Sequence, residues 1–172
     1  MNRAKSQMAD LSYGEKRELA NHKVIEELLG TKLMKLDKYN IMDWKEIQKA
    51  DDESPPWLVE QKARNLNSAE IINNPRYWYN NIPTALIGKH KIDYMKANGG
   101  TGIVIFDFTD KLMYWVFDDE EYKTFAVASE FCRGAREGVV DKPCAVVHIP
   151  MNMLKNVEEK EEDTDKLFVK FN

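Results

Sequence analysis

Apolar and polar positions recur with changing spacing along the chain, and these changes predict its elements. Residues 12–30 carry apolar side chains at partly helical spacing, with Ser12 as a candidate cap and Gly30 as a stop, which predicts a helix. The segment 32–44 alternates closely enough for a pair of short strands, and the polar, proline-bearing stretch after it predicts a loop. PWLVEQKAR, at 56–64, then predicts a central strand.

The middle of the chain predicts an irregular excursion followed by a helix. Residues 65–83 are rich in Asn, with an aromatic cluster and two prolines, which favours loops with at most a short helical turn. Residues 84–100 predict a helix that ends at Asn98 and Gly99. Its inward-facing apolar residues are expected to be Ile87, Ile92 and Met95.

The last part of the chain is rich in β-branched and aromatic residues and predicts strands. The four segments are GIVIFDF, KLMYWVFD, TFAVASEF and CAVVHIP, and the TDK turn between the first two indicates a hairpin. The tail from Met151 is expected to begin as a helix and to end as a charged, solvated stretch over about 156–172. The order of elements predicts an α/β (α+β) fold, with a mixed central β-sheet flanked by helices, in a single domain spanning 1–172.

Composition narrows the class of protein. The 172 residues carry a formal net charge of -4, which argues against a protein that coats nucleic acid by charge alone. An enzyme that acts on nucleic acid stays open, because carboxylates that hold divalent metals add negative charge at the site itself. No apolar run approaches the roughly 20 residues of a membrane helix, and the N-terminus has no apolar signal-peptide centre, so we expect an intracellular protein without membrane contact. Cys132 and Cys144 are expected to be ordinary thiols.

Charged residues share one face of the predicted strand 56–64. Side chains alternate between the two faces of a strand, so Glu60, Lys62 and Arg64 lie on one face together. Such a set is either an exposed ion pair of little energetic value or an acid and a base held together for chemistry. Upstream, Asp43 follows two apolar residues, where it is costly in a sheet unless it is solvated, hydrogen-bonded or bound to a metal. Glu18, on the predicted helix, can reach the same place.

These residue types match the needs of metal-dependent phosphodiester hydrolysis. Oxygen ligands select Mg²⁺ or Mn²⁺, and such ions neutralise a phosphate and lower the pKa of a bound water. A lysine beside them can orient that water or stabilise developing charge. The sequence therefore predicts a catalytic site composed of Glu18, Asp43, Glu60 and Lys62.

The order of these four residues resembles the PD-(D/E)xK nuclease superfamily, which contains restriction enzymes, junction resolvases and phage exonucleases. Its acidic helix residue, its Asp closing a strand and its Glu-x-Lys in the next strand correspond to Glu18, Asp43, Glu60 and Lys62. Met42 stands where many members have a proline before the Asp. The resemblance implies a restriction-endonuclease-like core and a nuclease that leaves a 5′-phosphate and a 3′-hydroxyl.

The resemblance also implies a metal shell and partners. Glu18, Asp43 and Glu60 would ligate one or two Mg²⁺ ions, for which Mn²⁺ can substitute, and the Gln61 carbonyl would complete the shell. DNA is the expected substrate and RNA the less favoured one, and a homodimer is compatible with the resemblance because many members dimerise. The expected nucleic-acid contacts are Arg64, Lys89, Lys91, Arg133 and Arg136.

A second resemblance extends over most of the chain, roughly residues 14–154. The pieces VEQKAR, PTALIGKHKIDYM, VIFDFTDKLMYWVFD and RGAREGVVDKPCAVVHIPMNML look similar to little-characterised nuclease-like proteins of phages and large DNA viruses. This similarity implies a viral or phage protein that acts inside a host cell.

Alternatives to these assignments stay open at this point. Lys89 and Lys91 are better explained as exposed helix lysines than as phosphate contacts, and the aromatic cluster 77–79 is expected to pack within the protein rather than to stack on bases. The helix carboxylates that compete with Glu18 are Glu15, Glu26 and Glu27. Two other functions also remain: a nuclease fold that binds nucleic acid or a protein without cutting, and an α/β interaction protein whose carboxylates meet by accident.

Overall fold

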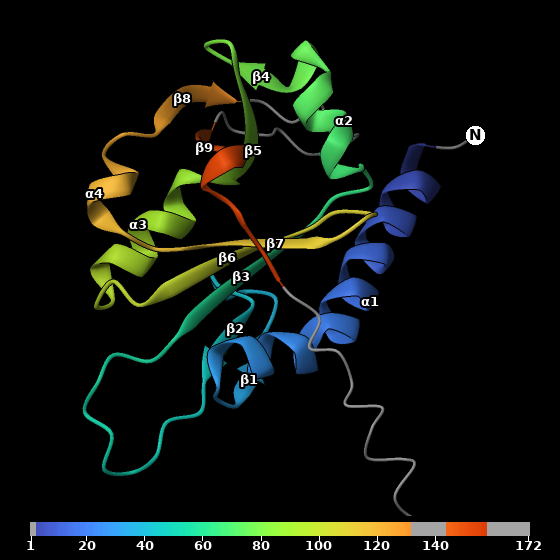
Figure 1. Cartoon of the computed structure of the whole chain (residues 1–172). Helices are drawn as coiled ribbons and strands as arrows, with labels where there is room; N and C mark the ends of the chain where they lie inside the picture. Colours follow the sequence, from blue (N-terminus) through green and yellow to red (C-terminus); the bar gives the residue numbers. More distant parts are fainter. Residues whose placement is uncertain (1–2, 132–143, 158–172) are drawn as a thin grey trace, which may run out of the picture.

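The structure is a computed structural model that describes residues 3–131 and 144–157. These residues form helices and two β-sheets, which confirms the predicted α+β class (Figure 1). The α-helices are α1 (Arg3–Leu29), α2 (Ser68–Asn73), α3 (Lys89–Ala97) and α4 (Asp119–Tyr122). Within the two described ranges, no helix is long and apolar enough to cross a bilayer.

The first sheet contains six strands in the order β1-β2-β3-β6-β7-β10. Its strands are β1 (Leu33–Lys35), β2 (Trp44–Glu46), β3 (Leu58–Ala63), β6 (Gly102–Asp107), β7 (Leu112–Val116) and β10 (Lys155–Asn156). The central pair, β3 and β6, is parallel, and the other neighbours are antiparallel. The sheet is therefore mixed, and the strand that carries Glu60 and Lys62 is central in it, as predicted.

The second sheet contains four antiparallel strands in the order β4-β5-β9-β8. Its strands are β4 (Trp78–Tyr79), β5 (Ile82–Gly88), β8 (Ala126–Phe131) and β9 (Cys144–Pro150). Two single turns of 3₁₀ helix, η1 (Pro75–Tyr77) and η2 (Met151–Met153), lie directly before β4 and directly after β9. The chain from β3 to β6 passes through this second sheet and α3 before it returns to the first sheet.

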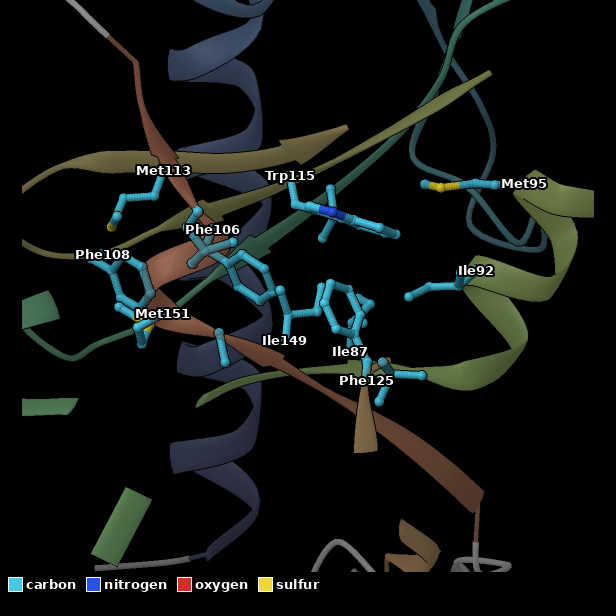
Figure 2. Packing of buried hydrophobic residues seen from close by; sticks show 14 of the residues in the cluster. Ile87, Ile92, Met95, Phe106, Phe108, Met113, Trp115, Phe125, Ile149 and Met151 are labelled. Carbon is cyan, nitrogen blue, oxygen red and sulfur yellow. The ribbon is translucent and has the colours of Figure 1, made fainter. Parts of the chain in front are cut away.

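Apolar residues cover both faces of the first sheet. On one face α1 packs through Ile25 against residues such as Val59 of β3 and Ile103 of β6. On the other face a larger cluster joins the first sheet to α3 and to the second sheet (Figure 2). Because both faces of β6 are covered, all of its residues are buried and its sequence is continuously apolar up to Asp107.

The structure changes the predicted first helix at its start and confirms its end. The helix begins at Arg3, so the prediction that Ser12 caps it is wrong. It ends at Leu29, and Gly30 adopts a φ of +67°, the left-handed conformation in which glycine ends a helix at little cost. Leu19, which contributed to the helical spacing, is 66% exposed, whereas Ile25 is the residue of this helix that enters the core.

The predicted helix over 84–100 is helical only from Lys89. Residues before it form β5, whose buried Ala85 and Ile87 alternate with Leu86, and β5 pairs with β9 over its whole second half. The short apolar run has no helical spacing of its own, so pairing with β9 decides its conformation. The predicted end of the helix is confirmed, because Asn98 is its C-cap and Gly99 has a φ of +99°.

The tail after β9 does not begin as an α-helix, so that prediction is wrong. Met151–Met153 make one 3₁₀ turn, and β10 follows at Lys155 as an edge strand on β7. Pairing with the exposed edge of β7 gives these residues backbone partners that a short isolated helix would not provide. The charged stretch expected from about 156 onward lies almost wholly outside the described residues.

Candidate functional site

Asp43 is fixed by the backbone of β3. The sequence had indicated that Asp43 closes a strand, but the residue lies in the bend directly before β2. Its N–H donates to the carbonyl of Val59 at 3.0 Å, and its Oδ2 accepts from the N–H of Gln61 at 2.8 Å. The Asp43 carboxylate is thereby held beside β3, just past Val59, where the pairing of β3 with β2 stops.

Glu60 is an acid enclosed in the centre of β3. Its side chain lies on the same strand face as Leu58, and the residue is only 5% exposed. Burial, and after it the negative charge of Asp43, raise the pKa of Glu60 to about 8 against the opposing effects of Lys91 and Lys62. The carboxyl group is thus held where its charged form is poorly solvated.

Lys91 reaches Glu60 from helix α3. Its Nζ lies 2.9 Å from Glu60 Oε2 and also donates a short hydrogen bond to the carbonyl of Ile41. The Lys91 side chain is 19% exposed. The interpretation of Lys91 as an exposed helix lysine is therefore wrong, because its ammonium group is an ion-pair partner of a buried acid.

Glu18 joins the site through a lysine of β1. The Lys35 ammonium forms a short ion pair with the Glu18 carboxylate, lies 3.8 Å from Asp43 Oδ1 and lies 4.8 Å from the ring centroid of Trp44. Burial raises the pKa of Glu18, the hydrogen bond from Lys35 lowers it, and the charge of Asp43 raises it. Among the carboxylates of α1, the structure brings Glu18 beside Asp43.

The three competing carboxylates of the same helix lie elsewhere. Glu26 binds the Lys32 ammonium at 2.8 Å and the N–H of Leu33 at 2.9 Å. Glu15 and Glu27 are exposed.

An ion pair between partly exposed Arg17 and buried Asp107 ties α1 to the end of β6, one residue before Glu18. The guanidinium group of Arg17 donates to both carboxylate oxygens of Asp107, with Nε 2.6 Å from Oδ2. Asn21 donates to the same carboxylate at 2.7 Å, and Asp107 itself is 0% exposed at the end of β6. Gln61 Nε2 also donates to the carbonyl of Arg17 at 3.2 Å, which ties this turn of α1 directly to the site strand.

The remaining predicted residues have different positions. Lys62 lies on the face of β3 that carries Glu60 and lowers the pKa of that acid. Arg64 donates to the carbonyl of Leu86 at 2.7 Å, which joins β3 to β5. Lys89 pairs with Asp93 at 2.6 Å on its own helix. Arg133 and Arg136 lie outside the described residues, as does Cys132.

The residues of the aromatic cluster contact other parts of the protein. The indole N–H of Trp78 donates to the carbonyls of Ile71 and Ile72 of α2, and Tyr79 stacks on His148 with ring centroids 4.0 Å apart. Trp78 is nevertheless 36% exposed, so the cluster is only partly packed within the protein.

A divalent cation needs several oxygen ligands around one point. In the described parts of the chain, no group of three or more His, Cys, Asp and Glu side chains lies close enough, as these side chains stand, to hold a metal ion. The carboxylates are nevertheless coupled, because the charge of Asp43 raises the pKa of both Glu18 and Glu60. The ammonium groups of Lys35 and Lys91 provide the neutralising positive charge.

The backbone adds an oxygen at the same edge. The Val59 carbonyl accepts from the N–H of Asp43, and the N–H of Gln61 donates to the Asp43 carboxylate. In a strand, the N–H and C=O of one residue point to the same side. The Gln61 carbonyl is therefore directed to the edge that holds the Asp43 carboxylate. Carboxylate and carbonyl oxygens are the ligands that Mg²⁺ and Mn²⁺ prefer. A cation could use these oxygens only if Lys35 and Lys91 moved away from Glu18 and Glu60.

Sequence reasoning missed the residues that act across elements. Lys35 and Asp107 received no role, and their partners Glu18 and Arg17 are 17 and 90 positions away in the chain. A signal for Asp107 does exist, because it is an acid at the end of the apolar run GIVIF, the same anomaly that identified Asp43. Lys35 has no comparable signal.

Comparison with protein-family models, with curated proteins and with solved structures returned no match for this chain. The functional argument therefore depends on the site itself.

Proposed function

We propose that this protein is a metal-dependent nuclease that hydrolyses phosphodiester bonds in DNA, using Mg²⁺ or Mn²⁺. The observation that carries the proposal is the position of Glu60, a buried acid beside the fixed carboxylate of Asp43, with Lys62 on its own strand face. Glu18 adds a third carboxylate from α1. The same four residues carry the resemblance to the PD-(D/E)xK nucleases.

Each residue has a distinct task in this proposal. Asp43, Glu60 and Glu18 would hold the cation, with the Gln61 carbonyl as a further ligand. A bound divalent cation supplies positive charge for the scissile phosphate and lowers the pKa of a water molecule. Lys62 would orient that water and stabilise the charge that develops on the phosphate oxygens.

The topology supports the proposal without being specific to it. The N-terminal helix α1 is followed by the antiparallel strands β1, β2 and β3, and the chain later returns to the same sheet as β6, parallel to β3 (Figure 1). A fold hosts many functions, so the four residues themselves carry the argument.

An accidental origin of the site is disfavoured by energetics. A charged carboxylate with a raised pKa in a sheet interior lowers the stability of the folded state, and an apolar residue of similar size would remove that cost. Stability alone therefore does not account for Glu60. A group whose pKa is strongly perturbed by burial and by a neighbouring charge is more often found in a functional site.

The proposal is tested with labelled duplex, single-stranded and branched DNAs and with RNA, in Mg²⁺, Mn²⁺ or EDTA. Wild type is compared with Asp43→Asn and Lys62→Met, and Lys123→Met is the control because Lys123 is exposed and pairs with Asp119 and Glu120 of α4. We expect metal-dependent cutting by wild type and Lys123→Met, and a loss of about a hundredfold or more in the two site variants.

Two results would count against a nuclease. If folded wild type cuts none of the substrates but still binds Mg²⁺ or Mn²⁺, the protein is a nuclease fold that binds without cutting. If wild type neither cuts nor binds metal, the carboxylates meet without a catalytic purpose.

A further inference from the structure

Lys91 occupies a position that a bound cation would need. Its ammonium group lies 2.9 Å from Glu60 Oε2, which is hydrogen-bonding distance to an acid that the proposed function assigns to the metal. A divalent ion and an ammonium group cannot both lie against one carboxylate oxygen of an enclosed acid without strong repulsion. The Lys91 ammonium group thus neutralises the Glu60 carboxylate in the absence of a metal ion.

The ammonium group of Lys91, on α3, contacts two other segments of the chain. Glu60 belongs to β3, and the Ile41 carbonyl belongs to the segment before β2. Asp43 and Lys62 act on the same carboxyl group, because Asp43 raises the pKa of Glu60 and Lys62 lowers it. The Ile41 carbonyl gives the ammonium group a second acceptor, and Ile41 is 37% exposed. Lys91 therefore has a hydrogen-bond acceptor near the surface that does not depend on Glu60.

We infer that Lys91 is the resident counter-cation of Glu60, and that its ammonium group leaves Glu60 when a divalent cation binds while it stays near the Ile41 carbonyl. This inference rests on the proposed function, since it concerns the same carboxylates. Lys91 is then a positioning residue, which keeps the enclosed acid neutralised before the cation arrives and sets how tightly the cation is held.

Lys35 differs from Lys91 in the acids that it serves. It lies between Glu18 and Asp43, both of which are more exposed to solvent than Glu60. Loss of its charge would leave carboxylates that water can still solvate. Lys91 is the lysine whose partner is shielded from water, so its charge has the larger influence on a cation at this site.

The first test follows Lys91 directly, without measuring activity. Protein that contains lysine labelled with ¹³C at Cε is titrated with MgCl₂, and buffer without MgCl₂ is the blank. The Lys91 resonance is identified by its loss in Lys91→Arg. We expect the Lys91 resonance to shift with the same midpoint as Mg²⁺ binding measured by calorimetry. The Lys89 resonance should stay in place, because Lys89 pairs with Asp93, which accepts a hydrogen bond from Tyr122 of α4 and not from a group of the site.

The second test separates charge from structure. Lys91→Gln keeps a hydrogen-bond donor without the charge, whereas Lys91→Arg keeps the charge. At the same pH, Lys91→Gln should bind Mg²⁺ about tenfold more tightly than wild type, while Lys91→Arg and the control Lys89→Gln should bind it as wild type does. A merely structural lysine would make binding weaker in Lys91→Gln.

The outcomes distinguish this inference from the proposed function. If Mg²⁺ binds while the Lys91 resonance stays in place, or if Lys91→Gln binds Mg²⁺ no more tightly than wild type, the counter-cation role is wrong and the metal site stands. If wild type binds neither Mg²⁺ nor Mn²⁺, both ideas are wrong.

Discussion

The backbone N–H of Gln61 donates a 2.8 Å hydrogen bond to Asp43 Oδ2. This contact brings a residue of the loop before β2 to the centre of β3, 18 positions further along the chain. It fixes one carboxylate beside the buried Glu60 and within 3.8 Å of the Lys35 ammonium. The charged groups of the site are therefore electrostatically coupled, and a change in one of them should alter the others.

Asp43→Asn should separate metal binding from stability. Asn keeps an oxygen that accepts from the Gln61 N–H but removes the charge that raises the pKa of Glu18 and Glu60. Without metal, we expect the variant to be at least as stable as wild type in urea denaturation, because the repulsion is gone. Its affinity for Mn²⁺, measured by calorimetry, should fall about tenfold or more.

The exposed loop residue Asp51 provides the control for that variant. Asp51→Asn should change neither quantity. A large loss of stability in Asp43→Asn, with unchanged affinity for Mn²⁺, would mean that Asp43 supports the fold and not a metal site.

Glu60→Gln should change how stability depends on pH. The folded state keeps the Glu60 proton up to about pH 8, whereas the unfolded chain releases it near 4.5. Between these values the folded state binds more protons, so the contribution of Glu60 to stability is complete below pH 4.5 and is lost as the pH rises through 8. Stability of wild type should therefore fall with rising pH in this window, relative to Glu60→Gln.

The size of that difference is limited by one proton. Its slope can reach at most about 1.4 kcal/mol per pH unit, within the window between the two pKa values. Denaturation in urea at several pH values from 5 to 9 measures it, with the exposed Glu70→Gln as control. Parallel stability curves for wild type and Glu60→Gln would show that Glu60 does not hold its proton in this range.

Local sequence patterns predicted the parts of the fold that local chemistry decides. The strands β6, β7 and β9 were found because β-branched and aromatic runs suit strands that are buried, and the glycine at position 30 marked the end of a helix. The short run from Thr84 to Gly88 was assigned to a helix because its spacing is ambiguous, and only the distant partner β9 makes it a strand.

The candidate site also contains residues that the sequence predicted and residues that it did not. Alternation along one strand correctly put Glu60 and Lys62 on one face, and the cost of an acid after apolar residues identified Asp43. The roles of Lys35 and Lys91 could not be predicted, because each depends on a contact between elements that only the folded chain brings together. The resemblance to a nuclease family assigned roles to the acids, but it gave none to Lys35, and it implied a nucleic-acid contact for Lys91 rather than an ion pair with Glu60.

The ion pair between Arg17 and Asp107 should prove to be the contact that holds α1 and, with it, Glu18. Arg17→Met would leave the fully buried Asp107 carboxylate with Asn21 as its side-chain donor, which should cost about 2 kcal/mol or more in urea denaturation. Lys16→Met, at an exposed position on the same helix, is the matched control. The double variant Arg17→Met with Asp107→Asn should recover part of the lost stability, because it removes the unpaired charge. If Arg17→Met is as stable as Lys16→Met, the ion pair does not hold the helix, and the position of Glu18 must depend on the apolar contacts around Ile25 instead.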